Sequence, residues 1–168
     1  KLRRLGGLDG HPDVSIPGIE SNTGSLGMGI SKAKGILWTK KYLKKSGNVV
    51  VMVGDGEFQE GQIFEALQTT AHQNLNDLIV IMDHNKVQSS QYVKKIIDLK
   101  DLKEKIKSFG WHVERCDGHN FKKINTIFDF PVVTKDTLNN YFTRPHVMRL
   151  KTINLESLLL KRFVKSSV

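Results

Sequence analysis

Two polar residues, Asp55 and Asn85, follow two short apolar runs and could together bind a divalent cation. Asp55 stands between Gly54 and Gly56 at the end of the run VVVMV, and Asn85 comes shortly after the run LIVIM. A carboxylate and an amide carbonyl are hard oxygen donors that suit Mg²⁺ or Ca²⁺, and a backbone carbonyl just after Asn85 could add a third ligand. Because Mg²⁺ takes its other ligands from water and phosphates, the pattern predicts a cation that holds a phosphorylated ligand.

A strand–helix–strand unit would bring these residues together. We expect strands at residues 48–53 and 77–82, each of which contains a continuous apolar run typical of parallel strands that are covered on both faces. Residues 60–74 carry apolar side chains at helical spacing, as a crossover helix would. A right-handed crossover makes the strands parallel, so both polar turns reach the carboxyl edge of the sheet, where α/β proteins bind ligands.

A purely structural interpretation of the same turns stays open. Gly54 and Gly56 could supply turn geometry, Asp55 could cap the following helix, and Asn85 could form an ordinary Asx turn. The matching asparagine at the second strand end favours the cation site. In that site the two glycines let the backbone come close to the ligand.

The other apolar patterns extend this unit into an α/β domain. We expect further helices at residues 26–45, 99–109 and 121–128, and a third strand at residues 111–116. Asn120 would cap the last helix. The fold class is α/β, with three αβα layers around a mainly parallel sheet.

Residues 1–130 form this domain, and residues 131–168 are a C-terminal segment without an assigned role. In that segment, residues 131–134 could form a strand and residues 152–168 a helix. Residues 86–97 are expected to be a loop.

Composition narrows the class of protein. The 168 residues carry a net charge of +9, but the lysines are spread along the chain and no nucleic-acid-binding signature is present, so a lysine-rich surface is favoured over nucleic-acid binding. No apolar run approaches the roughly 20 residues that span a membrane, and the basic N-terminus lacks the apolar core of a signal peptide. The single cysteine, Cys116, fits a reducing cytoplasm.

A glycine-rich stretch at residues 6–29 holds half of the 14 glycines of the chain. Backbone N–H groups in such a loop, leading into a helix, can bind phosphate. A flexible connection would have a similar composition, but Pro12, Pro17 and the interspersed polar residues favour a structured binding loop.

Three segments in order resemble the transketolase family. GDGEFQEG with LIVIMDHNKVQ resembles the thiamine diphosphate-binding motif, which begins with GDG and ends near an asparagine. GHPDVSIPGIESNTGSLGMGIS is similar to the GHPE, PGVE and TGSLGQGLS segment of transketolases, and FGWHVERCDGHN to their FGW and DGHD segment. The resemblance covers residues 5–128 and implies an incomplete thiamine diphosphate-binding fold.

The resemblance implies a cofactor site made of thiamine diphosphate and Mg²⁺, with Ca²⁺ as a possible substitute. Asp55, Asn85 and the backbone oxygen of Val87 would be the metal ligands. Gly54 and Gly56 would lie at the diphosphate, which the Gly56 amide contacts. Gly24 and Leu26 would lie against the cofactor near its diphosphate and aminopyrimidine.

Three further residues take roles by matched position. His11 would line the substrate channel and hydrogen-bond the substrate, which makes it the candidate catalytic residue. Glu60 would be an interface glutamate that communicates with the partner's catalytic glutamate. Asp83 would lie near the histidine network of the active site.

The implied activity is transfer of a two-carbon ketol unit from a ketose, often phosphorylated, to an aldose. The pyrimidine-binding domain that activates the cofactor matches no part of the sequence. We therefore expect a diphosphate-binding half that is inactive alone and works in a homodimer or heterotetramer, with a pyrimidine-binding subunit or further domains. The alternatives are an alpha-type subunit of a 2-oxo acid dehydrogenase, a deoxyxylulose-phosphate synthase, and a non-catalytic module of the thiamine fold.

Overall fold

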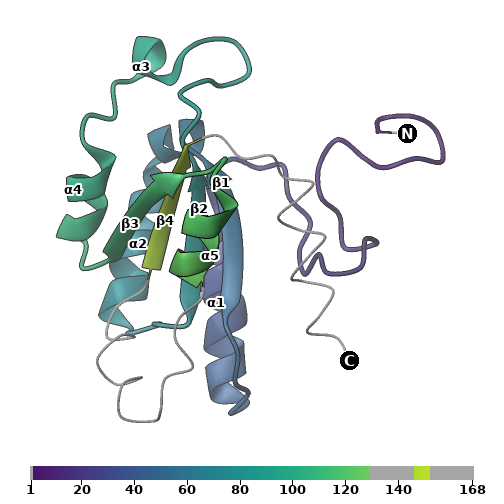
Figure 1. Ribbon diagram of the computed structural model, residues 1–168. Coiled ribbons are helices and arrows are strands. Elements are labelled where there is room, and N and C mark those ends of the chain that lie inside the picture. Colours follow the sequence, from purple (N-terminus) through teal and green to yellow (C-terminus); the bar gives the residue numbers. More distant parts are fainter. Residues whose placement is uncertain (1, 129–145, 152–168) are drawn as a thin grey trace.

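A single parallel sheet organises the described part of the chain, which in this computed structural model comprises residues 2–128 and 146–151 (Figure 1). Its strands are β1 (Val49–Gly54), β2 (Leu78–Asp83), β3 (His112–Asp117) and β4 (His146–Lys151). They lie in the order β1-β2-β4-β3, and every neighbouring pair is parallel. The predicted strand–helix–strand unit is confirmed, with Val49 of β1 aligned to Leu78 of β2.

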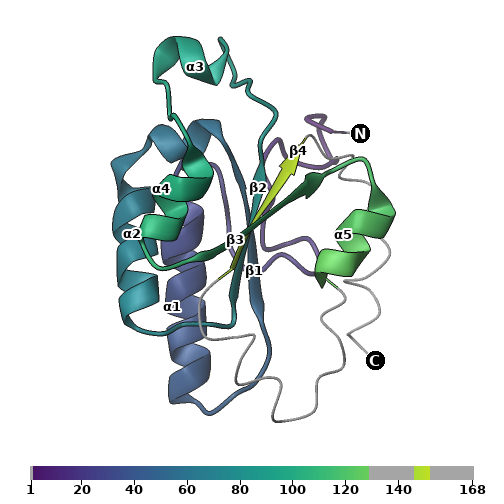
Figure 2. The same ribbon diagram turned by 60° about the vertical axis from the view of Figure 1, so that its left-hand side comes forward.

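Helices cover both faces of the sheet, which confirms the three-layer αβα architecture. Figure 2 shows α1, α2 and α4 on one face and α5 on the other. The helices are α1 (Met28–Tyr42), the 3₁₀ helix η1 (Gly56–Gln59), α2 (Gly61–His72), α3 (Val93–Ile96), α4 (Leu102–Ser108) and α5 (Phe121–Phe128). None of these described helices has the length and apolar character that a membrane span requires.

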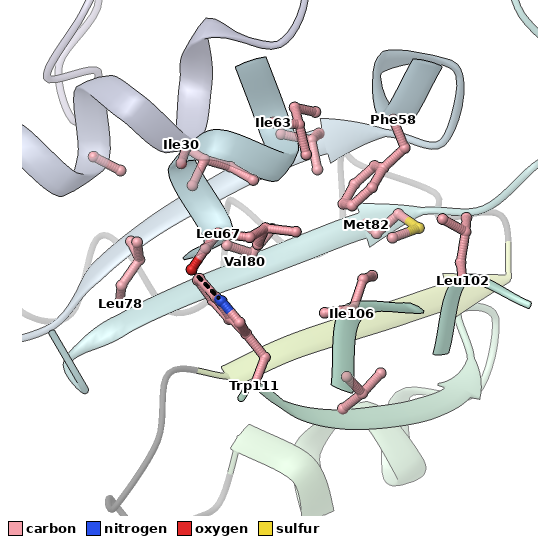
Figure 3. Close-up of a cluster of buried hydrophobic side chains, with 14 of the residues drawn as sticks. Ile30, Phe58, Ile63, Leu67, Leu78, Val80, Met82, Leu102, Ile106 and Trp111 are labelled. Carbon is pink, nitrogen blue, oxygen red and sulfur yellow. Dashed lines mark hydrogen bonds between the residues drawn. The ribbon is translucent and has the colours of Figure 1, made fainter. Parts of the chain in front are cut away.

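The hydrophobic core divides along the pleat of β2. Leu78, Val80 and Met82 point into the larger cluster beneath α1, α2 and α4, while Ile79 and Ile81 point into a smaller one beneath α5. Figure 3 shows the larger cluster, in which the indole Nε1 of Trp111 donates a hydrogen bond to the backbone oxygen of Leu67 over 2.9 Å. The continuous apolar run of β2 therefore reflects burial on both faces, as predicted.

Strand β1 is less buried than its sequence predicted. Val49, Val50 and Val51 are half-buried, and Met52 is 36% exposed. The reason is position, because β1 lies at an edge of the sheet and has a neighbour only on the β2 side among the described residues. The apolar run predicted the strand correctly and its burial wrongly.

The predicted helix ends were accurate to within a few residues. The N-terminal signal of α4 lies at Asp101, whose carboxylate accepts from the backbone N–H of Lys103 over 2.9 Å. Asn120 caps α5, as predicted, by accepting from the backbone N–H of Lys123 over 3.1 Å. The stretch expected to be a loop contains the short helix α3.

Strand β4 was not predicted from the sequence. It belongs to the segment that had no assigned role, yet it pairs with both β2 and β3. Residues 131–134 and 152–168, for which a strand and a helix were considered, lie outside the described residues. The domain boundary at residue 130 stays a prediction.

Candidate functional site

Asp55 occupies the turn that ends β1, and the residue is 1% exposed. Its Oδ2 atom accepts a hydrogen bond from the backbone N–H of Lys86 over 3.0 Å, and the Nε2 atom of His84 lies 3.6 Å from the same oxygen. Its Oδ1 atom is buried and has no hydrogen-bond partner among the described residues. A buried carboxylate oxygen without a partner is costly, so the site is chemically suited to a cation.

Burial raises the pKa of Asp55 above its ordinary value. The backbone N–H groups of Lys86 and Gly56 oppose this effect, and the nearby charge of Asp83 adds to it. Burial also raises the pKa of Asp83, which the hydrogen bond from Asn85 opposes. Asp55 and Asp83 therefore lie at the carboxyl ends of β1 and β2, and burial disfavours the charged form of each carboxyl group. A cation bound there would stabilise these charged forms.

The helix-cap interpretation of Asp55 is wrong. Asp55 precedes η1, but its side chain makes no capping hydrogen bond and instead reaches the loop after β2. The carboxylate thus joins the two polar turns that the sequence predicted would meet.

Asn85 forms the Asx turn that the structural interpretation considered. Its Oδ1 atom accepts from the backbone N–H of Val87 over 2.8 Å, and its Nδ2 atom donates to Asp83 Oδ2 over 3.2 Å. An amide oxygen has two lone pairs, so this oxygen keeps acceptor capacity for a cation. Between Asn85 and Val87, Lys86 has a left-handed φ of 68° and donates its N–H to Asp55.

The two glycines beside Asp55 differ in their surroundings. A Cβ atom on Gly54 would meet nothing within 4 Å, whereas one on Gly56 would lie 2.7 Å from the Oε1 atom of Gln88. Backbone at Gly54 is thus open to a ligand, and backbone at Gly56 is approached by the end of a flexible side chain. Among the described residues, no group of three or more His, Cys, Asp or Glu side chains is placed so that it could hold a metal ion. The predicted set of one carboxylate, one amide oxygen and one backbone oxygen does not need such a group.

The glycine-rich loop brings His11 against Gly24. A Cβ atom on Gly24, whose φ is 121°, would lie 3.3 Å from the His11 ring, so a larger residue is disfavoured there. Thr23 fixes the loop through its hydroxyl, which donates to the backbone oxygen of Pro12 over 3.1 Å. His11, Gly24 and Leu26 are all exposed, as a ligand-facing loop requires.

Sequence reasoning missed two side chains that join the predicted cofactor segments. The Glu57 carboxylate accepts from the N–H of Gly27 over 2.8 Å and from the N–H of Gly54 over 3.0 Å. Gln62 donates to the backbone oxygen of Leu26 over 2.6 Å. Glu60 lies between them, exposed and without a side-chain cap bond to α2. No spacing rule marks Glu57 or Gln62, because their partners are backbone groups, and those at Gly27 and Leu26 are 30 or more residues away in the sequence.

The described residues form an α/β domain with a candidate ligand site at the carboxyl edge of its sheet. A family model described as "Transketolase, thiamine diphosphate binding domain" matches residues 1–154. The chain belongs to this family, as its motifs predicted.

Proteins named as transketolases or as transketolase subunits are among the relatives of this chain. The chain is 36% identical over 121 residues to a protein of Phocaeicola vulgatus that is named as one of the subunits of apulose-4-phosphate transketolase, covering 72% of this chain and 43% of that protein. It is 40% identical over 118 residues to "6-deoxy-6-sulfo-D-fructose transketolase subunit SqwG" of Clostridium sp., covering 70% of this chain and 43% of that protein. The chain thus spans less than half the length of these relatives.

Solved transketolases share the fold. The transketolase of Campylobacter jejuni superimposes with a TM-score of 0.73 at 26% identity, covering 86% of this chain and 23% of that one. A transketolase variant from Pichia stipitis gives a TM-score of 0.74 at 27% identity, covering 90% of this chain and 23% of that one. These matches confirm the predicted thiamine-binding α/β fold.

Proposed function

We propose that the chain is the diphosphate- and Mg²⁺-binding half of a thiamine diphosphate-dependent transketolase. The observation that carries this proposal is the buried Asp55 carboxylate, whose Oδ1 atom has no hydrogen-bond partner among the described residues. The Lys86 N–H binds the other oxygen of this carboxylate and so holds Asn85 and Val87 beside it. Relatives named as transketolase subunits support the same assignment.

In this proposal, Asp55, Asn85 and the backbone oxygen of Val87 hold Mg²⁺, for which Ca²⁺ could substitute. The backbone at Gly54 and the Gly56 amide receive the diphosphate. Bound thiamine diphosphate supplies a nucleophilic carbon that can take up a two-carbon ketol unit.

The glycine-rich loop would complete the site. Gly24 and Leu26 lie against the cofactor, and His11 orients a sugar phosphate by hydrogen bonding. Glu60, exposed at the start of α2, faces the partner and communicates with its catalytic glutamate.

A pyrimidine-binding partner, present either as a separate polypeptide or as further domains, would complete the enzyme as a heterotetramer or homodimer. The two relatives described above are named as subunits, which supports a divided enzyme. We assign the protein to the cytoplasm on the basis of its lone cysteine, which has no disulfide partner in the chain.

Titration calorimetry of the full chain, alone and with a pyrimidine-domain partner, tests the cofactor site. We expect binding of thiamine diphosphate that requires Mg²⁺ and is lost in Asp55→Ala. The matched control is Asp98→Ala, because Asp98 also accepts a backbone N–H, that of Lys100 over 3.0 Å, but lies outside the site. A wild-type protein without Mg²⁺-dependent binding would contradict the proposal.

An activity assay tests the half-site. We expect ketol transfer from the chain together with a pyrimidine-domain partner and none from the chain alone. Robust turnover by the chain alone would contradict the proposal that it supplies only one half of the active site.

A further inference from the structure

One peptide group of the glycine-rich loop, that between Leu26 and Gly27, is held from both sides. Its carbonyl oxygen accepts from Gln62 Nε2 over 2.6 Å, and its N–H donates to Glu57 Oε2 over 2.8 Å. In a trans peptide these two groups point in opposite directions, so the two bonds together fix the rotation of the peptide plane. We call Glu57 and Gln62 the peptide clamp.

The backbone conformation at Gly27 depends on this arrangement. Gly27 is buried and left-handed, with φ 77° and ψ −10°. A Cβ atom there would lie 2.9 Å from Glu60 Cβ and 2.9 Å from Gln62 Nε2. The absence of a side chain at Gly27 therefore lets the clamp residues approach the backbone closely.

The clamp also connects the loop to the turn that carries Asp55. The second oxygen of Glu57 accepts from the N–H of Gly54 over 3.0 Å. One carboxylate therefore holds backbone from both segments that the proposed function assigns to the cofactor. Its negative charge lies at the N-terminus of α1, whose first turn has no acidic residue of its own, and this placement is electrostatically favourable.

We propose that Glu57 and Gln62 are positioning residues that orient the Leu26–Gly27 peptide for the thiamine part of the cofactor. This inference rests on the proposed function. Leu26 is 57% exposed, so its side chain gains little from packing within the described chain, and the clamped peptide sets its direction. Gln62 acts on the loop alone, whereas Glu57 acts on the loop and on Gly54.

The two roles predict different binding defects. In calorimetric titrations of the full chain with Mg²⁺, we expect Gln62→Ala to weaken thiamine diphosphate about tenfold and to leave inorganic diphosphate unchanged, since losing one hydrogen bond costs about 1.4 kcal/mol, a factor of ten. Glu57→Ala should weaken both ligands. Glu57→Gln, which can keep only one accepted bond, should be intermediate.

Gln59→Ala is the matched control. Gln59 belongs to η1, but its Nε2 atom donates to the backbone oxygens of Val93 and Ile97, on the α3 side. We expect this variant to bind both ligands like the wild type. Equal weakening in Gln59→Ala would mean that the effect is general loosening and would overturn the positioning role.

Amide hydrogen exchange measures the strength of the peptide clamp in the absence of any ligand. The N–H of Gly27, which donates to Glu57, should exchange at least tenfold faster in Glu57→Ala than in the wild type, with circular dichroism confirming that the variant is folded. Unchanged Gly27 exchange in Glu57→Ala, or wild-type affinity of Gln62→Ala for thiamine diphosphate, would overturn the inference while leaving the proposed function intact. A wild-type chain that binds neither ligand would overturn both.

Discussion

Asp55 Oδ2 lies 3.0 Å from the backbone nitrogen of Lys86, and this hydrogen bond joins the turn after β1 to the turn after β2. Lys86 stands between Asn85 and Val87, the two other proposed metal ligands. A single contact therefore sets the spacing of three ligands that come from two strands. The carboxylate achieves this while its other oxygen stays buried and unpartnered among the described residues.

Asp55→Asn should stabilise the ligand-free chain and abolish its response to Mg²⁺. The neutral amide removes a buried charge but can still accept the Lys86 N–H, so we expect a gain on the order of 1 kcal/mol in the free energy of unfolding at neutral pH. Urea unfolding measures this gain. A lower stability of the variant at neutral pH would mean that the buried charge of Asp55 does not destabilise the ligand-free chain, and would contradict the assignment of Asp55 as a cation ligand.

The gain in Asp55→Asn should depend on pH. Because burial raises the pKa of Asp55, the folded chain holds a proton that the unfolded chain has already released. Wild-type stability therefore falls as pH rises from the ordinary carboxyl value of about 3.9 through the raised folded value, and stays lower above it. The stability difference between variant and wild type should grow over this window. A difference that is constant between about pH 3.5 and pH 7 would contradict this prediction.

Gly27→Ala should be strongly destabilising, whereas Gly35→Ala should be stabilising. Gly27 has a positive φ, and an added Cβ would lie 2.9 Å from Glu60 Cβ, so we expect a loss of about 2 kcal/mol or more. Gly35 is exposed within α1, and a Cβ there meets nothing within 4 Å, so we expect a gain of roughly 0.5–1 kcal/mol. Thermal unfolding of the two variants compares them directly, and similar effects at both positions would refute the backbone geometry given for Gly27.

Trp111→Phe should cost about 2 kcal/mol, because it removes the buried hydrogen bond to Leu67 and leaves space in the core. Trp38 is the matched control, since it is 56% exposed and stacks on Tyr42 at the surface of α1. Trp38→Phe should change stability by less than about 0.5 kcal/mol. Each variant keeps one of the two tryptophans, so Trp38→Phe reports the fluorescence of the buried Trp111 and Trp111→Phe that of the exposed Trp38. Equal emission maxima of the two variants would contradict these environments.

Cys116 should react slowly with thiol reagents. Burial raises the pKa of this thiol, and the neighbouring charge of Asp117 raises it further, so little thiolate is present at neutral pH. We expect labelling by a chromogenic disulfide to be at least tenfold slower in the folded chain than in urea, and to accelerate with rising pH. Equal rates in both states would place Cys116 at the surface.

The sequence predicted those parts of the molecule that depend on local patterns. Apolar runs identified β1 and β2, the cap residue Asn120 identified the start of α5, and the placement of Asp55 and Asn85 at strand ends predicted that their turns would meet. The position of a strand within the sheet is a property of the whole fold, so the edge location and partial exposure of β1 could not be predicted. The hydrogen bonds that the Glu57 side chain accepts from the backbone amides of Gly27 and Gly54 leave no periodic signal either.

The position of β4 has a consequence for the order of folding. This strand comes last among the described elements, yet it lies between β2 and β3 in the middle of the sheet. During synthesis, β2 and β3 each have an unpaired edge until residues 146–151 are made, because β4 is the strand that pairs with both of them. Chain collapse can bury the core under α1 and α2 beforehand, but closure of the sheet is a late, long-range event, and chains that end before β4 should be prone to edge-to-edge aggregation.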